Sequence, residues 1–157
     1  MNIRKIANTV IQFIIYRVIE ILGACSSIVG LLLLISLISY SPNDPNFIFP
    51  ENTGINNILG FQGSYISDLF FQSVGIMSYL ISFTLILTGI NIFRSKDLFL
   101  LIDNIFCVIL YSFFGTLFLD YFYQNAYDLY INGNGGFVGQ YLNQTFFGNL
   151  IKLQSNV

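Results

Sequence analysis

The sequence predicts an all-α integral membrane protein with three clear transmembrane helices, an incomplete fourth helix and short connecting loops. Hydrophobic residues make up 55% of the 157 positions and charged residues only 9%, against roughly a quarter charged in ordinary soluble domains. With so little polar surface, a water-soluble fold cannot cover its apolar excess, which must therefore face lipid. The long uncharged runs must be helices, because a lone strand cannot satisfy its backbone in a bilayer.

The first transmembrane span is predicted at about 21–40. No charged residue stands between Glu20 and Asp44, and at about 1.5 Å per residue this run exceeds a hydrocarbon core of roughly 30 Å. Upstream, the apolar residues of 1–20 recur at helical spacing, which predicts a cytoplasmic interfacial helix leading into a transmembrane domain at 21–157. A plain helical extension of the first span fits the same pattern.

The second and third spans are predicted at about 68–93 and 98–119. Both are long apolar runs, interrupted only by Asp103 near the start of the third. The region 137–157 mixes polar and apolar residues and contains no apolar run of the length that a span needs. It is therefore predicted to be a partial fourth helix.

The basic residues predict the orientation of these spans in the membrane. The loops at 41–67 and 120–136 contain no Lys or Arg, whereas 1–20 and 94–97 hold all the basic residues except Lys152. The positive-inside rule therefore places the N-terminus and the 94–97 loop in the cytoplasm and the other two loops outside. We expect a multi-pass membrane protein with its N-terminus in the cytoplasm. The basic residues of the two cytoplasmic segments are Arg4, Lys5, Arg17, Arg94 and Lys96.

Several classes of chemistry are disfavoured by the residues present. There is no histidine, the commonest general base and metal ligand, and no P-loop pattern for nucleotide hydrolysis occurs. Basic residues gather only in pairs, so we expect this chain not to bind nucleic acid directly. Cys25 and Cys107 lie in apolar runs and are predicted to be small buried side chains. We predict no enzymatic activity, no catalytic residue, no cofactor and no metal.

Acidic residues near the span boundaries are candidates for function, because charge inside a bilayer is costly. Asp68 and Asp120 are predicted to be helix-end residues in water. Asp103, beside Asn104, is predicted to reach the cytoplasmic headgroup zone. The alternative is a small transporter or channel subunit, which would be favoured if Asp103 and Asn104 faced a wet cavity between helices.

Small residues at helical spacing predict where the spans pack. A separation of four residues places them on one helix face, where they let two backbones approach closely in lipid. The first span has this spacing in Gly23 and Ser27 and in Ser26 and Gly30, and the second span carries the small residues Gly75, Ser78 and Ser82.

Motifs follow the first span in a definite order. Residues 39–47 read Ser-Tyr-Ser-Pro-Asn-Asp-Pro-Asn-Phe, in which Pro42 and Pro45 bracket a predicted Asx-type turn and stop the helix. Residues 57–63 then hold Asn-x-x-Gly-x-x-Gly, and 68–75 hold Asp-x-x-Phe-x-x-x-Gly. The residues proposed as structural motif positions are Ser41, Pro42, Asp44, Pro45, Asn57, Gly60, Gly63, Asp68, Gly75, Gly135, Gly136 and Gly139.

This order resembles the N-terminal four-helix membrane domain of the FtsK/SpoIIIE family of DNA translocases. The similarity covers about 21–148, with Asp68 at a helix start and the glycines of 135–139 before the fourth helix. It implies a membrane-anchoring and self-associating domain for a motor at the division septum, acting in cell division and chromosome segregation. The implied partners are membrane lipids, further copies of the chain and other cell-division membrane proteins.

Two departures from the family pattern limit what the resemblance implies. The fourth helix is truncated, and neither the cytoplasmic linker nor the RecA-like motor occurs in these residues. We therefore expect this polypeptide to anchor a translocase without being a motor itself. A scaffold that serves no motor is the remaining alternative.

Overall fold

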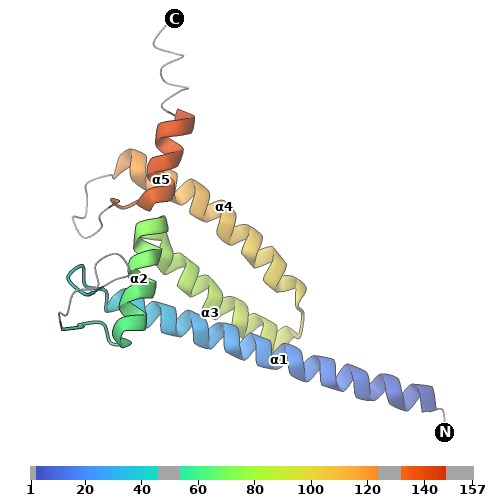
Figure 1. Ribbon diagram of the computed structural model, residues 1–157. Helices are drawn as coiled ribbons and strands as arrows, with labels where there is room; N and C mark the ends of the chain where they lie inside the picture. The colour runs from blue at the N-terminus through green and yellow to red at the C-terminus, as the bar shows by residue number, and fades with distance from the viewer. Residues whose placement is uncertain (1–2, 46–53, 124–131, 148–157) are drawn as a thin grey trace, which may run out of the picture.

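The computed structural model describes residues 3–45, 54–123 and 132–147, and within these ranges it contains helices and no strand (Figure 1). Three helical stretches are long and apolar enough to cross a membrane: Asn8–Ile38, Met77–Ser95 and Phe99–Phe122. Both findings confirm the predicted fold class. The helices are α1 (Ile3–Ile38), α2 (Gly60–Val74), α3 (Met77–Ser95), α4 (Phe99–Phe122), α5 (Gly136–Leu142) and a π-helical turn, η1 (Asn143–Phe147).

Helices α1 and α3 run side by side and form the tightest pair in the molecule (Figure 1). A methyl group on Gly23 would lie 2.8 Å from the carbonyl oxygen of Gly89, and one on Gly30 would lie 2.8 Å from the backbone nitrogen of Ile86. The Ser27 hydroxyl donates a hydrogen bond to the Ile86 carbonyl at 3.1 Å. The small residues predicted to pack therefore do so, with the backbones in contact.

The N-terminal segment continues directly into the first span. Helix α1 runs without a break from Ile3 to Ile38, which is the geometry of a helical extension, and the location of 1–20 at the membrane surface stays a prediction. The physical reason is that no proline or glycine interrupts the segment before Gly23, and apolar periodicity alone does not distinguish a helix on a membrane from one that enters it.

The predicted second span at 68–93 is wrong in its boundaries, because the helix is interrupted at Gly75. This glycine has a positive φ of 58° and separates α2 from α3. Helix α2 begins at Gly60, so Asp68 lies in its middle and not at a helix start. In Figure 1, α2 runs across the ends of α1 and α3. Hydropathy did not reveal the break, since a single glycine hardly changes the average of a long window.

Helix α4 leans away from the α1–α3 pair and meets α3 at a few points (Figure 1). The hydroxyls of Thr84 and Tyr111 lie 2.9 Å apart, and a methyl on Gly115 would lie 2.9 Å from the terminal carbon of Met77. Only 6% of its apolar stretch is buried. Most of the α4 surface is therefore left for lipid or another protein.

The predicted partial fourth helix is short in the structure. Helix α5 begins at Gly136 and ends at Leu142, and η1 continues it to Phe147. The rest of the predicted 137–157 helix lies outside the described residues. Helix α5 contacts α4 and α2, and in Figure 1 it lies near the same end of the molecule as α2.

The buried apolar core is small and lies where α1, α2 and α3 meet. Phe71 is fully buried, with its ring centroid 4.8 Å from that of Tyr40 and 5.4 Å from that of Tyr79. The prediction of buried cysteines is wrong, because Cys25 and Cys107 are both exposed on their helices. Apolar side chains need no burial when the surrounding solvent is hydrocarbon.

Candidate functional site: two polar clusters at the α2 end

The motif residues gather at one end of the bundle, where α2 and α5 lie (Figure 1). We call this the α2 end, and the opposite end, with the turn between α3 and α4, the Lys96 end. Two groups of mostly buried residues, joined by hydrogen bonds or close backbone contact, occupy the α2 end. The first, the Asn57 cluster, comprises Ser36, Ser39, Asp44, Asn56, Asn57, Gly63, Ser64 and Ser67. The second, the Asn134 cluster, comprises Gly75, Thr116, Asp120, Asn134, Gly135, Gly136, Gly139 and Asn143.

Asp44 closes the loop that follows α1. One carboxylate oxygen accepts hydrogen bonds from the backbone and side-chain amides of Asn56, both at 2.9 Å, and the other accepts the backbone N–H of Asn57 at 2.8 Å. The turn itself is made by the backbone, with the Asp44 N–H donating to the Ser41 carbonyl at 3.1 Å. The predicted Asx-type turn at Pro42 and Pro45 is thus a backbone turn. The Asp44 side chain instead bonds to Asn56 and Asn57 on the other side of the loop.

Asn57 connects that loop to the end of α1. Its side-chain amide donates to the carbonyls of Ser36 at 2.9 Å and Ser39 at 3.3 Å, which are among the last carbonyls of a helix and lack an intrahelical donor. Its side-chain oxygen accepts the Leu59 N–H at 3.1 Å, so the Asx turn lies here. A methyl on Gly63 would overlap that same oxygen. The glycine therefore leaves room for the asparagine.

Serines complete the Asn57 cluster, and sequence reasoning missed them. The Ser36 hydroxyl donates to the Gly63 carbonyl at 2.6 Å, and the Ser64 hydroxyl donates to the Pro45 carbonyl at 3.0 Å. Both serines are buried. The predicted helix end could have pointed to these serines, because the unpaired carbonyls there and in the facing loop need hydrogen-bond donors.

Asp68 lies beside this cluster and is 8% exposed. It accepts hydrogen bonds from the Tyr40 hydroxyl at 3.3 Å and from the Gln72 side-chain amide at 2.8 Å. The prediction of a helix-end residue in water is wrong for Asp68. The two donors replace water for this carboxylate, and the Tyr40 bond joins the segment just after α1 to α2.

The Asn134 cluster depends on close backbone contact at glycines. The Ile76 N–H donates to the Asn134 carbonyl at 3.0 Å, and a methyl on Gly75 would overlap that carbonyl. Gly136 has a φ of 63°, and a methyl there would lie 2.6 Å from the Ser73 carbonyl. The start of α5 therefore packs against the backbone of the turn that separates α2 from α3.

Asp120 occupies the other side of this cluster. Its side chain is 2% exposed, and one oxygen accepts a hydrogen bond from the Asn143 side-chain amide at 2.8 Å. Methyl groups on Gly135 and Gly139 would lie 2.5 and 2.6 Å from the Thr116 carbonyl, so the first turn of α5 lies against the α4 backbone. The prediction of Asp120 as a water-exposed helix end is wrong, because α5 covers it.

Two oxygens of the Asn134 cluster have no hydrogen-bond partner among the described residues. They are one carboxylate oxygen of Asp120 and the side-chain oxygen of Asn134, and both are buried. The Asn134 side-chain amide donates to the Tyr123 carbonyl. In this cluster, two buried side-chain oxygens thus lack a donor among the described residues. In the Asn57 cluster, by contrast, the side-chain oxygens of Asp44 and Asn57 all accept hydrogen bonds.

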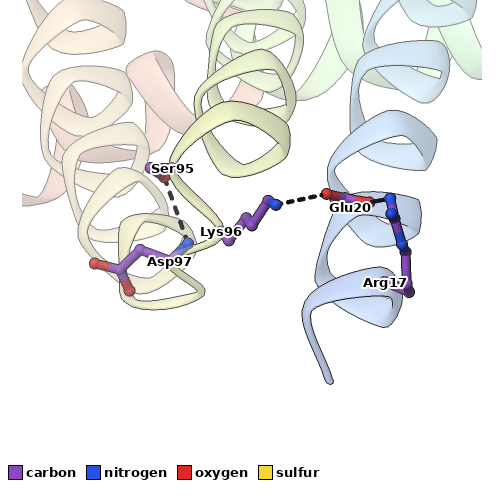
Figure 2. Close-up of polar contacts among 5 residues, drawn as sticks. All are labelled: Arg17, Glu20, Ser95, Lys96 and Asp97. Carbon is purple, nitrogen blue, oxygen red and sulfur yellow. Dashed lines mark hydrogen bonds and ion pairs between the residues drawn. The ribbon is translucent and has the colours of Figure 1, made fainter. Parts of the chain in front are cut away.

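An ion-pair group closes the Lys96 end (Figure 2). Glu20 on α1 lies 2.6 Å from the Arg17 guanidinium and 3.0 Å from the Lys96 ammonium. Lys96 ends α3 in the left-handed conformation, with φ at 58°. The Asp97 carboxylate then accepts the Phe99 N–H at 2.9 Å and starts α4. The two basic segments of the sequence thus lie at the same end of the bundle, as the predicted topology requires.

Among the described residues, no group of three or more His, Cys, Asp or Glu is placed to bind a metal. A groove of about 510 Å³ lies between α1, α2 and α3, and Asp103 and Asn104 are not among the residues that line it. Asp103 is exposed on α4 and Asn104 is half-buried. This groove therefore gives no support to the transporter alternative.

Comparison with known proteins agrees with the helical arrangement. The DNA translocase FtsK of Rickettsia bellii is 35% identical over 69 residues, which is 44% of this chain and 9% of that protein. The DNA translocase FtsK of Azospirillum brasilense is 31% identical over 87 residues, covering 54% of this chain and 14% of that protein. The DNA translocase FtsK of Caulobacter vibrioides is 31% identical over 75 residues.

No solved structure matches the chain. The family described as the 4TM region of DNA translocase FtsK/SpoIIIE matches residues 16–153. This is most of the sequence, and it includes the larger part of the first candidate membrane span and all of the other two. The chain therefore belongs to the FtsK/SpoIIIE family of DNA translocases, of which it is the membrane region.

Proposed function

We propose that this chain anchors a DNA translocase in the bacterial inner membrane at the division septum, where it associates with further copies of itself. The observation that carries the proposal is the family match over 16–153, which coincides with three helices able to cross a membrane. The chain spans only 9–14% of the length of the relatives named above. A link between this chain and their translocase activity is therefore part of the proposal.

The Asn57 cluster supports an anchoring role because it joins separate segments at one end of the bundle. Buried hydrogen bonds tie the end of α1, the described residues that follow it and the first turns of α2 together. The proposed partners at this end are other cell-division membrane proteins, and membrane lipids surround the spans.

The motor function is proposed to lie outside these residues. No P-loop pattern occurs in the sequence, and its three lysines, Lys5, Lys96 and Lys152, stand in no phosphate-binding motif. A purified, detergent-solubilised preparation should release no phosphate from ATP and should lose any duplex DNA binding by about physiological salt. Turnover that survives removal of contaminating ATPases would contradict the anchor role.

Septal location is tested with a fluorescent protein fused to the chain in dividing bacteria. The expected result is enrichment at the division site above that of an unrelated three-span membrane protein expressed at the same level. An even distribution around the cell envelope would reject the septal part of the proposal. Membrane insertion is measured separately by fractionation, so the two parts are distinguishable.

Orientation is tested by labelling single cysteines in a background with Cys25→Ser and Cys107→Ser. Asn43→Cys lies in the turn after α1, and Ser95→Cys lies at the Lys96 end; both positions are exposed. An impermeant thiol reagent applied from the periplasmic side should label the first and spare the second. The opposite pattern would place the Lys96 end outside the cell.

A further inference from the structure

We propose that copies of this chain associate by packing α3 of one copy antiparallel against α4 of a second copy, with Arg94 of one paired with Asp103 of the other. The inference rests on the proposed self-association and names the surface that mediates it. Two exposed stripes, one on each helix, carry the argument.

The stripe on α3 consists of side chains separated alternately by three and four residues, as on one face of a helix. They lie away from Gly89, which contacts α1, and next to Thr84, which contacts α4 of the same chain. Phe83 is 50% exposed and Leu87 is 60% exposed. The α3 stripe is Leu80, Phe83, Leu87, Ile90 and Arg94.

The stripe on α4 has the same alternating spacing. It borders Tyr111 and lies farther around the helix from Gly115, the two residues through which α4 meets its own α3. Leu110 is 42% exposed and Phe114 is 62% exposed. The α4 stripe is Asp103, Cys107, Leu110, Phe114 and Leu117, of which the last is half-buried.

The two stripes match in depth when they run antiparallel. Within one chain, the Thr84–Tyr111 contact shows which residues of α3 and α4 lie at the same level. Arg94 is ten residues beyond Thr84, and Asp103 is eight residues before Tyr111. At about 1.5 Å per residue, the two charges therefore differ in depth by about 3 Å, which an arginine side chain readily spans.

Arg94 and Asp103, at the ends of the two stripes, have opposite charges and form no ion pair among the described residues. Among the described residues, the ion pairs are those of Glu20 with Arg17 and Lys96, and neither Arg94 nor Asp103 takes part in one. Both side chains are exposed. A carboxylate near the hydrocarbon is costly without a partner, and the pairing in a second copy supplies one. Opposite charges also select this register over its neighbours.

Disulfide formation tests the contact directly, because Cys107 already lies in the α4 stripe. In a Cys25→Ser background, Ile90→Cys should form disulfide-linked dimers or larger species with Cys107 when membranes containing the whole chain are oxidised with copper phenanthroline. The matched control is Phe93→Cys, which is at a similar depth and 51% exposed and is turned about 100° around α3 from Arg94, at 3.6 residues per turn. That control should give no more dimer than Cys107 alone.

Charge reversal tests the ion pair. Arg94→Asp and Asp103→Arg should each lower the dimer yield on the order of fivefold, and the two together should restore it. If Ile90→Cys reduces expression, Leu87→Cys with Leu110→Cys in a cysteine-free background tests the same register. Failure of both pairs to link would overturn the interface.

The oligomeric state separates this inference from the proposed function. Counting photobleaching steps of a fluorescent fusion in the membrane measures it without cysteines. Several photobleaching steps per spot, without disulfide-linked dimers, would support self-association and reject this interface. Single steps throughout would reject both, and lipid would then cover the two stripes.

Discussion

The Asn57 cluster and the Asn134 cluster lie at the same end of the molecule and are built by different means. The first is held by side chains: each oxygen of Asp44 accepts at least one hydrogen bond, and Asn57 uses both its amide and its carbonyl. The second is held by backbone contact at Gly75, Gly135 and Gly136. In it, two buried side-chain oxygens have no partner in the described part of the chain.

The difference indicates which kind of substitution each cluster tolerates. A cluster of satisfied side chains loses most when one partner is removed, because the other is left buried and unpaired. A cluster of close backbones loses most when a side chain is added, because backbone cannot move aside as the end of a flexible side chain can. Three substitutions, ordered by expected effect, test this distinction through thermal and denaturant unfolding in detergent.

Gly75→Ala should have the largest effect and lower the free energy of unfolding by about 3 kcal/mol or more. The new methyl group would overlap the Asn134 carbonyl, and the residue would keep its positive φ of 58°. Gly60→Ala is the matched control, because Gly60 has a φ of 68° and no atom within 4 Å of the added carbon. It should lose only about 1 kcal/mol. Equal losses would show that the contact with Asn134 is not tight.

Asp44→Ala should lower the free energy of unfolding by about 2–3 kcal/mol, because it removes the acceptor for three hydrogen bonds and leaves the buried Asn57 N–H unpaired. The control is Asn43→Ala, an exposed neighbour in the same turn, which should stay within about 0.5 kcal/mol of the parent. A parent-like Asp44→Ala would mean that Pro42 and Pro45 hold the loop without the carboxylate.

Asp120→Asn should have the smallest effect, a change of less than about 1 kcal/mol. One oxygen remains to accept the bond from Asn143, and the oxygen that is replaced accepts none from the described residues. The matched substitution Asp44→Asn replaces an oxygen that is in use and should lose about 1–2 kcal/mol. If Asp120→Asn costs as much as Asp44→Asn, the unpaired oxygen has a donor after all, and the contrast between the clusters fails.

Much of the fold was predictable from local sequence. The predicted third span at 98–119 closely matches α4, because it is a single apolar run with no helix breaker. The small residues Gly23 and Ser27 predicted a packing face on the first span, and the structure shows that α3 is the helix packed against it. The prediction failed at Gly75, which divides the second span, since an average over many residues does not detect one backbone angle. It also failed for Asp68 and Asp120, whose burial depends on distant segments.

Composition alone determined that this chain lies in a bilayer, because 9% charged residues cannot solvate a globule. The order of its motifs indicated the family before any geometry was known. Only the tertiary structure decided that Asp44 reaches Asn57 and that Asn134 contacts Gly75. These pairings join segments far apart in the chain, and they depend on the angle at which α2 and α5 cross the spans. No local pattern encodes that angle, because it results from the packing of several helices at once.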